Sequence, residues 1–152
     1  MTSDHDLSVL NSLITTTIDS ADGFERAAED ASSGQFKQMF DEFGRERRQC
    51  VSRLQETVRS LGGTPNDDGS LTAGVHRRWL DLRDALTGAD DEAIIAEVER
   101  GEDYIKSKYE EALADTNLST TATSAIREAF QSVKAGHDRA SQIKHRMQGA
   151  QA

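Results

Sequence analysis

The chain has 152 residues, a length that usually forms a single domain. Hydrophobic residues make up 36% of it, with five Phe, two Tyr and one Trp. This composition can fill one slender core, but it supplies too little apolar surface for a buried sheet covered by helices. With few β-branched clusters, it disfavours β architecture.

The net charge limits the classes of partner, and the cysteine content and N-terminal hydropathy bear on the compartment. Its 18 basic and 27 acidic residues give a net charge of −9, which disfavours nucleic acids and anionic membranes as partners because phosphates require a basic face. One cysteine excludes an internal disulfide. No N-terminal apolar run has the length of a signal peptide or membrane span, so we expect a soluble, cytoplasmic protein.

The first half of the chain predicts two long helices joined by a short turn. Apolar residues recur at spacings of three and four from Leu7 to Ala31 and again from Phe36 to Leu61. These stripes predict helices over residues 5–32 and 35–61. Gly34 lies where a helix commonly ends in a left-handed residue, and so short a gap requires an antiparallel hairpin.

The segment after Leu61 has the composition of a loop, with Gly62, Gly63 and Pro65 close together. A shorter helix is predicted over residues 71–86, with Ser70 as its N-cap and Trp79 as an apolar anchor. Two further long helices are predicted over residues 91–114 and 120–147. Asp90 and Ser119 are their expected N-caps.

The long connection between the two hairpins favours one topology. It can carry the chain along the bundle and return it to the other end, as in ferritin-like folds. We therefore predict an all-α fold: a four-helix bundle, ferritin-like, with a short helix in a long crossover between helices 2 and 3. One domain would span residues 1–152. An up-down-up-down bundle with the short helix across one end is the alternative.

Polar residues on or beside the apolar stripes are the candidates for function, because helical bundles build their sites from inward side chains. Carboxylates and imidazoles in such a core are the ligands of di-iron or di-manganese centres. The candidate metal ligands are Glu25, Glu46, Glu99, Glu102 and His137. Iron or manganese would be the metal.

The sequence departs from the full dinuclear pattern, which has a Glu-x-x-His pair on each of two helices. The residue three positions before His137 is Lys134, and no histidine in the chain follows a glutamate at that spacing. The alternative interpretation is that Arg47, Arg100 and His137 form buried ion pairs with Glu25, Glu99 and Glu102.

Other residues with reactive or unusual side chains have structural interpretations. Cys50 lies at a core spacing and is expected to be a small buried hydrophobe. Gly101 is isolated within a helix, where we expect it to permit close helix approach. We find no catalytic triad order, phosphate-binding loop or Cys-x-x-Cys motif, so no catalytic residue is assigned.

Several short segments occur along the chain in a familiar order: Gly23-Phe24 with Ala27-Ala28-Glu29, Leu61-Gly62-Gly63-Thr64-Pro65, His76-Arg77-Arg78-Trp79, Glu99-Arg100-Gly101-Glu102-Asp103 and His137-Asp138. Together they resemble a bacterial family of small four-helix-bundle proteins in the ferritin-like group, described as a domain of unknown function. The resemblance covers nearly the whole length. It implies a ferritin-like fold and a bacterial, cytoplasmic setting, without an activity, substrate or catalytic residue.

The leading functional expectation is a non-enzymatic bundle that acts by binding or assembly. A homodimer through helix faces is expected by analogy with other ferritin-like domains. The alternative is a metal-binding redox or metal-storage protein that uses the five candidate ligands in an atypical site. A weaker alternative is a module whose acidic helices dock on a basic protein surface.

Overall fold

The computed structural model describes residues 4–70, 73–88 and 90–150, and within these ranges every regular element is a helix. The helices are α1 (Asp4–Asp30), α2 (Gly34–Ser60), α3 (Ala73–Thr87), α4 (Asp91–Leu113) and α5 (Thr120–Ala150). Their bounds lie within three residues of the predicted ones wherever both can be compared. The all-α prediction is thus confirmed, while the predicted start of the short helix at residues 71–72 lies outside the described ranges.

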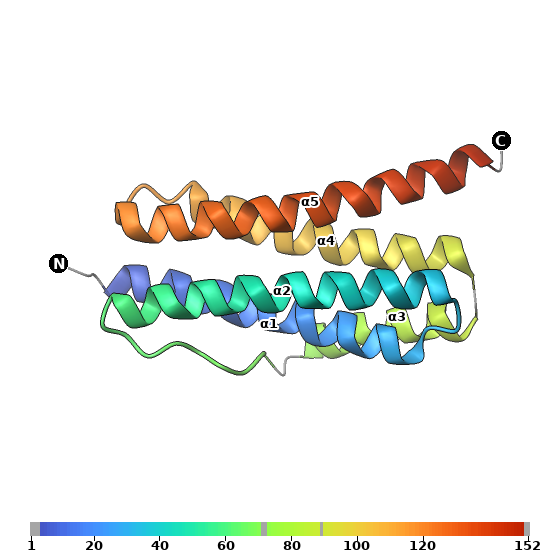
Figure 1. Cartoon of the computed structure of the whole chain (residues 1–152), viewed down its shortest axis with the longest axis horizontal. Helices are drawn as coiled ribbons and strands as arrows, with labels where there is room; N and C mark the ends of the chain where they lie inside the picture. The colour runs from blue at the N-terminus through green and yellow to red at the C-terminus, as the bar shows by residue number, and fades with distance from the viewer. Residues whose placement is uncertain (1–3, 71–72, 89, 151–152) are drawn as a thin grey trace.

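The four long helices pack as two antiparallel hairpins, α1 with α2 and α4 with α5 (Figure 1). α2 also packs on α5, and α1 on α4, while the short α3 lies against α1 and α4. α2 and α4 point the same way, because the connection after α2 runs back along the bundle before α3 begins (Figure 1). Each long helix is therefore antiparallel to both of its neighbours.

Polar side chains of α1 fasten this connection to the bundle. Asn11 Nδ2 donates to the Thr64 carbonyl (3.2 Å), and Asn66 Nδ2 donates to Thr15 Oγ1 (3.0 Å). Further along, the Ser70 amide and hydroxyl both donate to the Asp19 carboxylate, at 2.8 and 2.6 Å. The α1 residues that bind the connection advance from residue 11 to residue 19 as the connection advances from residue 64 to residue 70. The connection therefore runs parallel to α1.

The ends of the helices agree in part with the expected signals. The Asp90 carboxylate accepts from the amides of Glu92 and Ala93, and the Ser119 hydroxyl accepts from the Ala122 amide, as predicted for N-caps. One assignment was wrong: Gly34 is the first residue of α2 and does not end α1 in a left-handed conformation. The predicted Ser70 N-cap depends on residues 71–72, which lie outside the described ranges; the Ser70 hydroxyl donates to Asp19.

The core consists of two apolar clusters that follow one another along the bundle. One holds Leu10, Ile14, Leu54 and Ile126 among others, near the start of α1, and the other holds four Phe side chains of α1 and α2. The buried residues of the long helices are largely those of the predicted stripes. Between the clusters lies a layer of buried polar side chains, where the candidate site begins. In the part of the chain that the structure describes, we find no helix long and apolar enough to cross a membrane.

Candidate functional site

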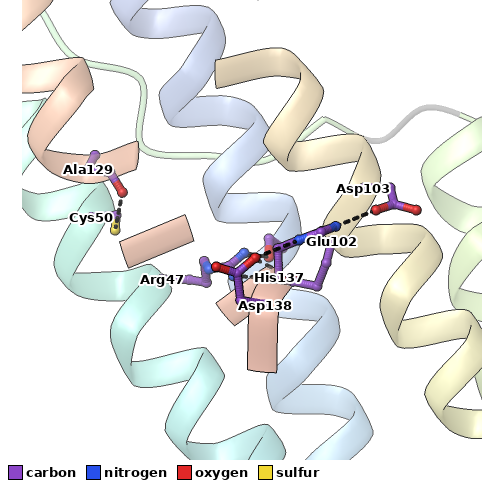
Figure 2. Close-up of polar contacts among 8 residues, drawn as sticks. Arg47, Cys50, Glu102, Asp103, Ala129, His137 and Asp138 are labelled. Atoms are coloured by element: carbon purple, nitrogen blue, oxygen red, sulfur yellow. Dashed lines mark hydrogen bonds and ion pairs between the residues drawn. The ribbon is translucent and has the colours of Figure 1, made fainter. Parts of the chain in front are cut away.

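The centre of the bundle holds a buried ion pair between Arg47 of α2 and Glu102 of α4 (Figure 2). The two side chains are 0% and 1% exposed. Arg47 Nη2 donates to Glu102 Oε2 (2.5 Å) and Nη1 to Oε1 (3.2 Å), so the contact is bidentate. Nη1 also donates to the Ser20 hydroxyl of α1 (3.2 Å). The predicted pairing of Arg47 with an inward glutamate is thus found at Glu102.

The fourth long helix makes room for this pair with a glycine. A Cβ atom on Gly136 of α5 would lie 2.6 Å from Arg47 Nη2 and 3.0 Å from Glu102 Oε2. The ion pair therefore fills the space that a side chain would take, and all four long helices meet at one level. The apolar spacing of this helix predicted that His137 points inward. In the structure His137 is only partly buried, and the buried residue of this turn is its neighbour Gly136.

Burial dominates the electrostatics of this layer. It raises the pKa of the Glu102 carboxyl, while Arg47 and, more weakly, His137 act to lower it. One layer further along, the Tyr109 hydroxyl is 2.7 Å from Thr17 Oγ1, and burial raises the pKa of Tyr109. These groups are held by hydrogen bonds in a water-poor core.

Cys50, one turn along α2 from Arg47, is 1% exposed. Its Sγ contacts the Ala129 carbonyl at 3.8 Å (Figure 2), and burial raises the pKa of the thiol. A buried thiol with a raised pKa is a poor nucleophile. The expected structural role of Cys50 is consistent with this placement.

Two of the other candidate metal ligands have ion-pair partners of their own. Glu25 is exposed and pairs with Arg48 (2.6 Å), and Glu99 pairs with Lys144 (2.8 Å). Neither pairs with Arg47 or Arg100 as the alternative interpretation expected. Arg100 instead pairs with Glu97, within α4.

His137 and Glu46 complete the set. His137 Nε2 is 2.6 Å from Asp103 and its Nδ1 is 3.3 Å from Asp138, both exposed aspartates (Figure 2). Glu46 is half-buried, and its charge adds to the raised pKa of Glu102. Among the described residues, no group of three or more His, Cys, Asp or Glu side chains is placed to hold a metal ion. In this arrangement Arg47 already supplies the positive charge beside Glu102, which does not fit a dinuclear centre at that carboxylate.

A pocket of about 680 Å³ opens between α1, α3 and α4, and we call it the α1–α3–α4 pocket. Its walls come from residues between positions 16 and 26 of α1, 68–70 of the connection, 75–82 of α3 and 97–105 of α4. Ser20 and Glu102 belong to the lining, so the central ion pair lies at the inner wall. Phe24, Trp79 and Tyr104 contribute aromatic rings.

Two helix glycines belong to the lining of this pocket. A Cβ atom built on Gly23 of α1 or Gly101 of α4 would meet no heavy atom of the described structure within 4 Å. Our expectation that Gly101 permits close helix approach was therefore wrong. Glycine in a helix interior costs about 1 kcal/mol relative to alanine, and both positions lie in the pocket lining.

Charged side chains of the pocket fall into two groups. Asp19 holds the connection through Ser70, and desolvation raises the pKa of its carboxyl. Arg26 and Arg78 lie over aromatic rings, with guanidinium carbons 5.8 Å from the Trp79 centroid and 4.1 Å from the Tyr104 centroid. The sequence analysis missed this pocket, because it depends on where the crossover lays α3; the only signal was a pair of isolated helix glycines.

The fold and the site define an all-helical bundle with a charged pair at its centre and a pocket at its side. Residues 6–115 match the model of the family described as Domain of unknown function (DUF2383), and the chain belongs to this family. The matched span runs from α1 through the end of α4 and so contains the whole α1–α3–α4 pocket. No curated protein matches the sequence.

Proposed function

We propose that the protein is a non-enzymatic, ferritin-like bundle that binds a small organic molecule in the α1–α3–α4 pocket. The topological part of the proposal is supported by the parallel course of α2 and α4 and by the connection fastened along α1. This is the arrangement of a bundle with one long crossover.

The observation that carries the proposal is the pocket itself, whose lining includes Gly23 and Gly101. Its volume, about 680 Å³, falls in the range of sites for drug-sized molecules, roughly 300–1,000 Å³. Its walls combine aromatic and aliphatic side chains with five carboxylates and two arginines, so the lining is more charged than the mainly apolar walls typical of such sites. Alanine at Gly23 or Gly101 would favour the helix, and its Cβ atom would meet no described heavy atom within 4 Å.

Filling the pocket tests the proposal. The probe is 3-phenylpropan-1-ol, an uncharged molecule with an aromatic body, and the readouts are Trp79 fluorescence and saturation-transfer NMR. Trp79 is the chain's single tryptophan and lines the pocket. We expect the wild type to bind the probe and Gly101→Phe to bind it at least about tenfold more weakly, a difference of about 1.4 kcal/mol.

The control is Gly149→Phe, which adds the same ring near the end of α5, where a Cβ atom also meets no described heavy atom within 4 Å. This variant should bind like the wild type. No binding by the wild type, or equal binding by Gly101→Phe, would overturn the proposal.

The second candidate is the metal-binding protein predicted from Glu25, Glu46, Glu99, Glu102 and His137. Glu102 is already paired with Arg47, so a metal ion at this carboxylate would have to displace that guanidinium. Elemental analysis of untagged protein after incubation with Fe(II), Mn(II) or Zn(II) distinguishes the two. Stoichiometric metal that is lost in Glu102→Ala, but kept in the exposed Glu29→Ala, would establish this candidate.

The homodimer predicted from the sequence remains a proposal of its own. Tyr104 is the one large hydrophobic side chain classed as exposed in the described ranges, at 40%. It lies at the pocket, so an interface there would compete with a ligand. Light scattering of the purified chain, with and without 3-phenylpropan-1-ol, measures the oligomeric state directly.

A further inference from the structure

Acidic side chains outnumber basic ones in the α1–α3–α4 pocket. Its lining holds two arginines, Arg26 and Arg78, and five carboxylates: Asp19, Asp22, Asp68, Glu97 and Glu102. Arg26 lies over the Trp79 ring and Arg78 over the Tyr104 ring, so the lining already accommodates positive charge against its aromatic faces. Burial raises the pKa of Asp19, while Ser70 and, more weakly, Arg78 act to lower it.

The five carboxylates differ in what they leave for a ligand. Three are paired with arginines outside the lining: Asp22 with Arg48, Glu97 with Arg100 and Glu102 with Arg47. Asp19 accepts from the Ser70 amide and hydroxyl, and Asp68 is exposed, where water satisfies its oxygens. Among the described residues, Oε2 of Glu97 is the one side-chain oxygen that is buried without a hydrogen-bond partner.

Glu97 Oε2 is the acceptor that a donor in the pocket can satisfy. The other oxygen of this carboxylate, Oε1, accepts from Arg100 Nη1 at 2.6 Å. The Arg100 side chain is 63% exposed, so water and salt screen its charge, and it offsets the negative charge of Glu97 only in part. Because the last torsion of a glutamate side chain is soft, the carboxylate can turn Oε2 toward a donor in the pocket. A buried acceptor without a partner is costly, so such a donor is favoured.

We propose that the ligand of the α1–α3–α4 pocket is an organic ammonium ion with an aromatic body, whose N–H groups donate to the Glu97 carboxylate. An ammonium group carries donors and no acceptor, and its hydrogen bond to a carboxylate is charge-assisted. The aromatic body packs against Phe24 and Trp79, which line the same pocket as Glu97. The inference rests on the proposed function, since it names the class of molecule that the pocket takes.

Three probes with one body and different charge test this inference: 3-phenylpropylamine, 3-phenylpropan-1-ol and 3-phenylpropionate. Dissociation constants are measured at physiological salt by Trp79 fluorescence and saturation-transfer NMR. The amine should bind at least about tenfold more tightly than the alcohol, and the acid more weakly than either. The advantage of the amine over the alcohol should fall below about threefold in Glu97→Gln, which removes the negative charge and keeps the length of the side chain.

Glu42→Gln is the matched control. Glu42 of α2 is half-buried and pairs with an arginine, Arg139, at 2.7 Å, but it lies outside the pocket lining. This variant should keep the full preference for the amine. An equal loss in Glu42→Gln would mean that only the net charge of −9 matters, which overturns the assignment.

Arg100→Gln gives a second test, with the opposite sign. It removes the cation bound to Oε1 of Glu97, and Arg100 lies outside the pocket lining. The amine, whose ammonium group then has no competing charge at Glu97, should bind at least about twofold more tightly than to the wild type, while the alcohol is unaffected. A purely structural role of Glu97 predicts no such gain, so unchanged or weaker binding of the amine would contradict the inference. This variant keeps the test available if Glu97→Gln does not fold.

The outcomes separate the inference from the function on which it rests. If none of the probes binds, the proposed function fails together with the inference. If the alcohol binds and the amine binds no better, the pocket is a binding site but not for organic cations. A preference for the acid would likewise overturn the inference and assign the pocket to carboxylates.

Discussion

Arg47 is a fully buried guanidinium in the middle of a narrow bundle, and its environment is built around its charge. Glu102 binds it from α4, Ser20 from α1, and its guanidinium carbon lies 5.7 Å from the Phe24 ring centroid. Removing two charges from water is costly, so such a pair adds little net stability compared with well-packed apolar residues. Breaking it on one side only is different, because an uncompensated charge then remains in the core.

This asymmetry predicts the behaviour of a double-mutant cycle at the pair. Glu102→Leu leaves Arg47 buried without its carboxylate and should lower the free energy of unfolding by about 3–5 kcal/mol. Arg47→Met with Glu102→Leu replaces both partners by apolar side chains and should recover most of that loss. Urea denaturation followed by circular dichroism measures the free energy of unfolding of Glu102→Leu, of Arg47→Met and of the double variant. Additive losses in the double variant would contradict the expected coupling.

The same substitution at two glycines should have opposite effects. Gly101→Ala adds a methyl group to open space in α4 and should raise the free energy of unfolding by about 0.5–1 kcal/mol, the gain in helix propensity. Gly136→Ala makes the same gain in α5, but its Cβ would lie 2.6 Å from Arg47 Nη2. Since the Arg47 guanidinium is fully buried and bound by Glu102 and Ser20, we expect a net loss of stability. Denaturation curves of the two variants give the signs directly, and a stabilised Gly136→Ala would show that the ion pair can shift freely.

At the scale of the helices, α3 differs from the other four. Leu86 is its one buried hydrophobic residue in the described ranges, and α3 packs on α1 and α4 only. Trp79 and Leu82 are partly buried against the edge of the second apolar cluster. A helix with so little buried surface belongs to the less stable part of the molecule.

We therefore expect α3 to detach before the bundle unfolds. The Trp79 fluorescence transition in urea should have a lower midpoint than the circular dichroism transition, which reports all helices. Binding of a pocket ligand should bring the two midpoints closer, because the ligand contacts α3 and the bundle together. Coincident transitions without ligand would show that α3 unfolds with the core.

The residues that sequence reasoning placed well are those fixed by one helix alone. Spacing of three and four identified the buried faces, and Asp90 and Ser119 were found as caps because capping is local. Glu25 is exposed and Glu99 is partly buried, because both neighbour a stripe, where a small rotation of the helix decides between core and surface. The pocket could not be predicted at all, since its volume depends on how three helices and the crossover are placed together.

For the molecule as a whole, the excess of acidic groups shapes its response to pH. Hydrogen bonds lower the pKa values of Glu25 (from Arg48), Glu42 (from Arg139) and Asp115 (from the Asn117 amide and His5). A lowered carboxyl pKa contributes stability above the ordinary value, 4.5 for glutamate, and loses it as the pH falls through the folded value. Burial raises the pKa of Asp19, whose contribution has the opposite sense and declines as the pH rises.

Glu25 allows a direct test of this acid response. Between about pH 6 and pH 3 the melting temperature of the wild type should fall more than that of Glu25→Gln, which has no such carboxylate to protonate. The effect is small, below about 1 kcal/mol, because the Glu25–Arg48 pair is exposed. Glu29→Gln, one turn further along α1 and without an ion pair among the described residues, should follow the wild-type curve. Parallel curves for all three proteins would contradict the assigned role of Glu25.

The buried position of Cys50 also allows the rate of bundle opening to be measured. It is the chain's single thiol, it is 1% exposed, and it faces α5 on the side away from the pocket. An alkylating reagent can reach it only when α2 and α5 separate, so the rate of alkylation reports how often they separate. No cysteine has to be introduced for this measurement. Slower alkylation in the presence of a pocket ligand would show that binding between α1, α3 and α4 is transmitted across the whole width of the bundle.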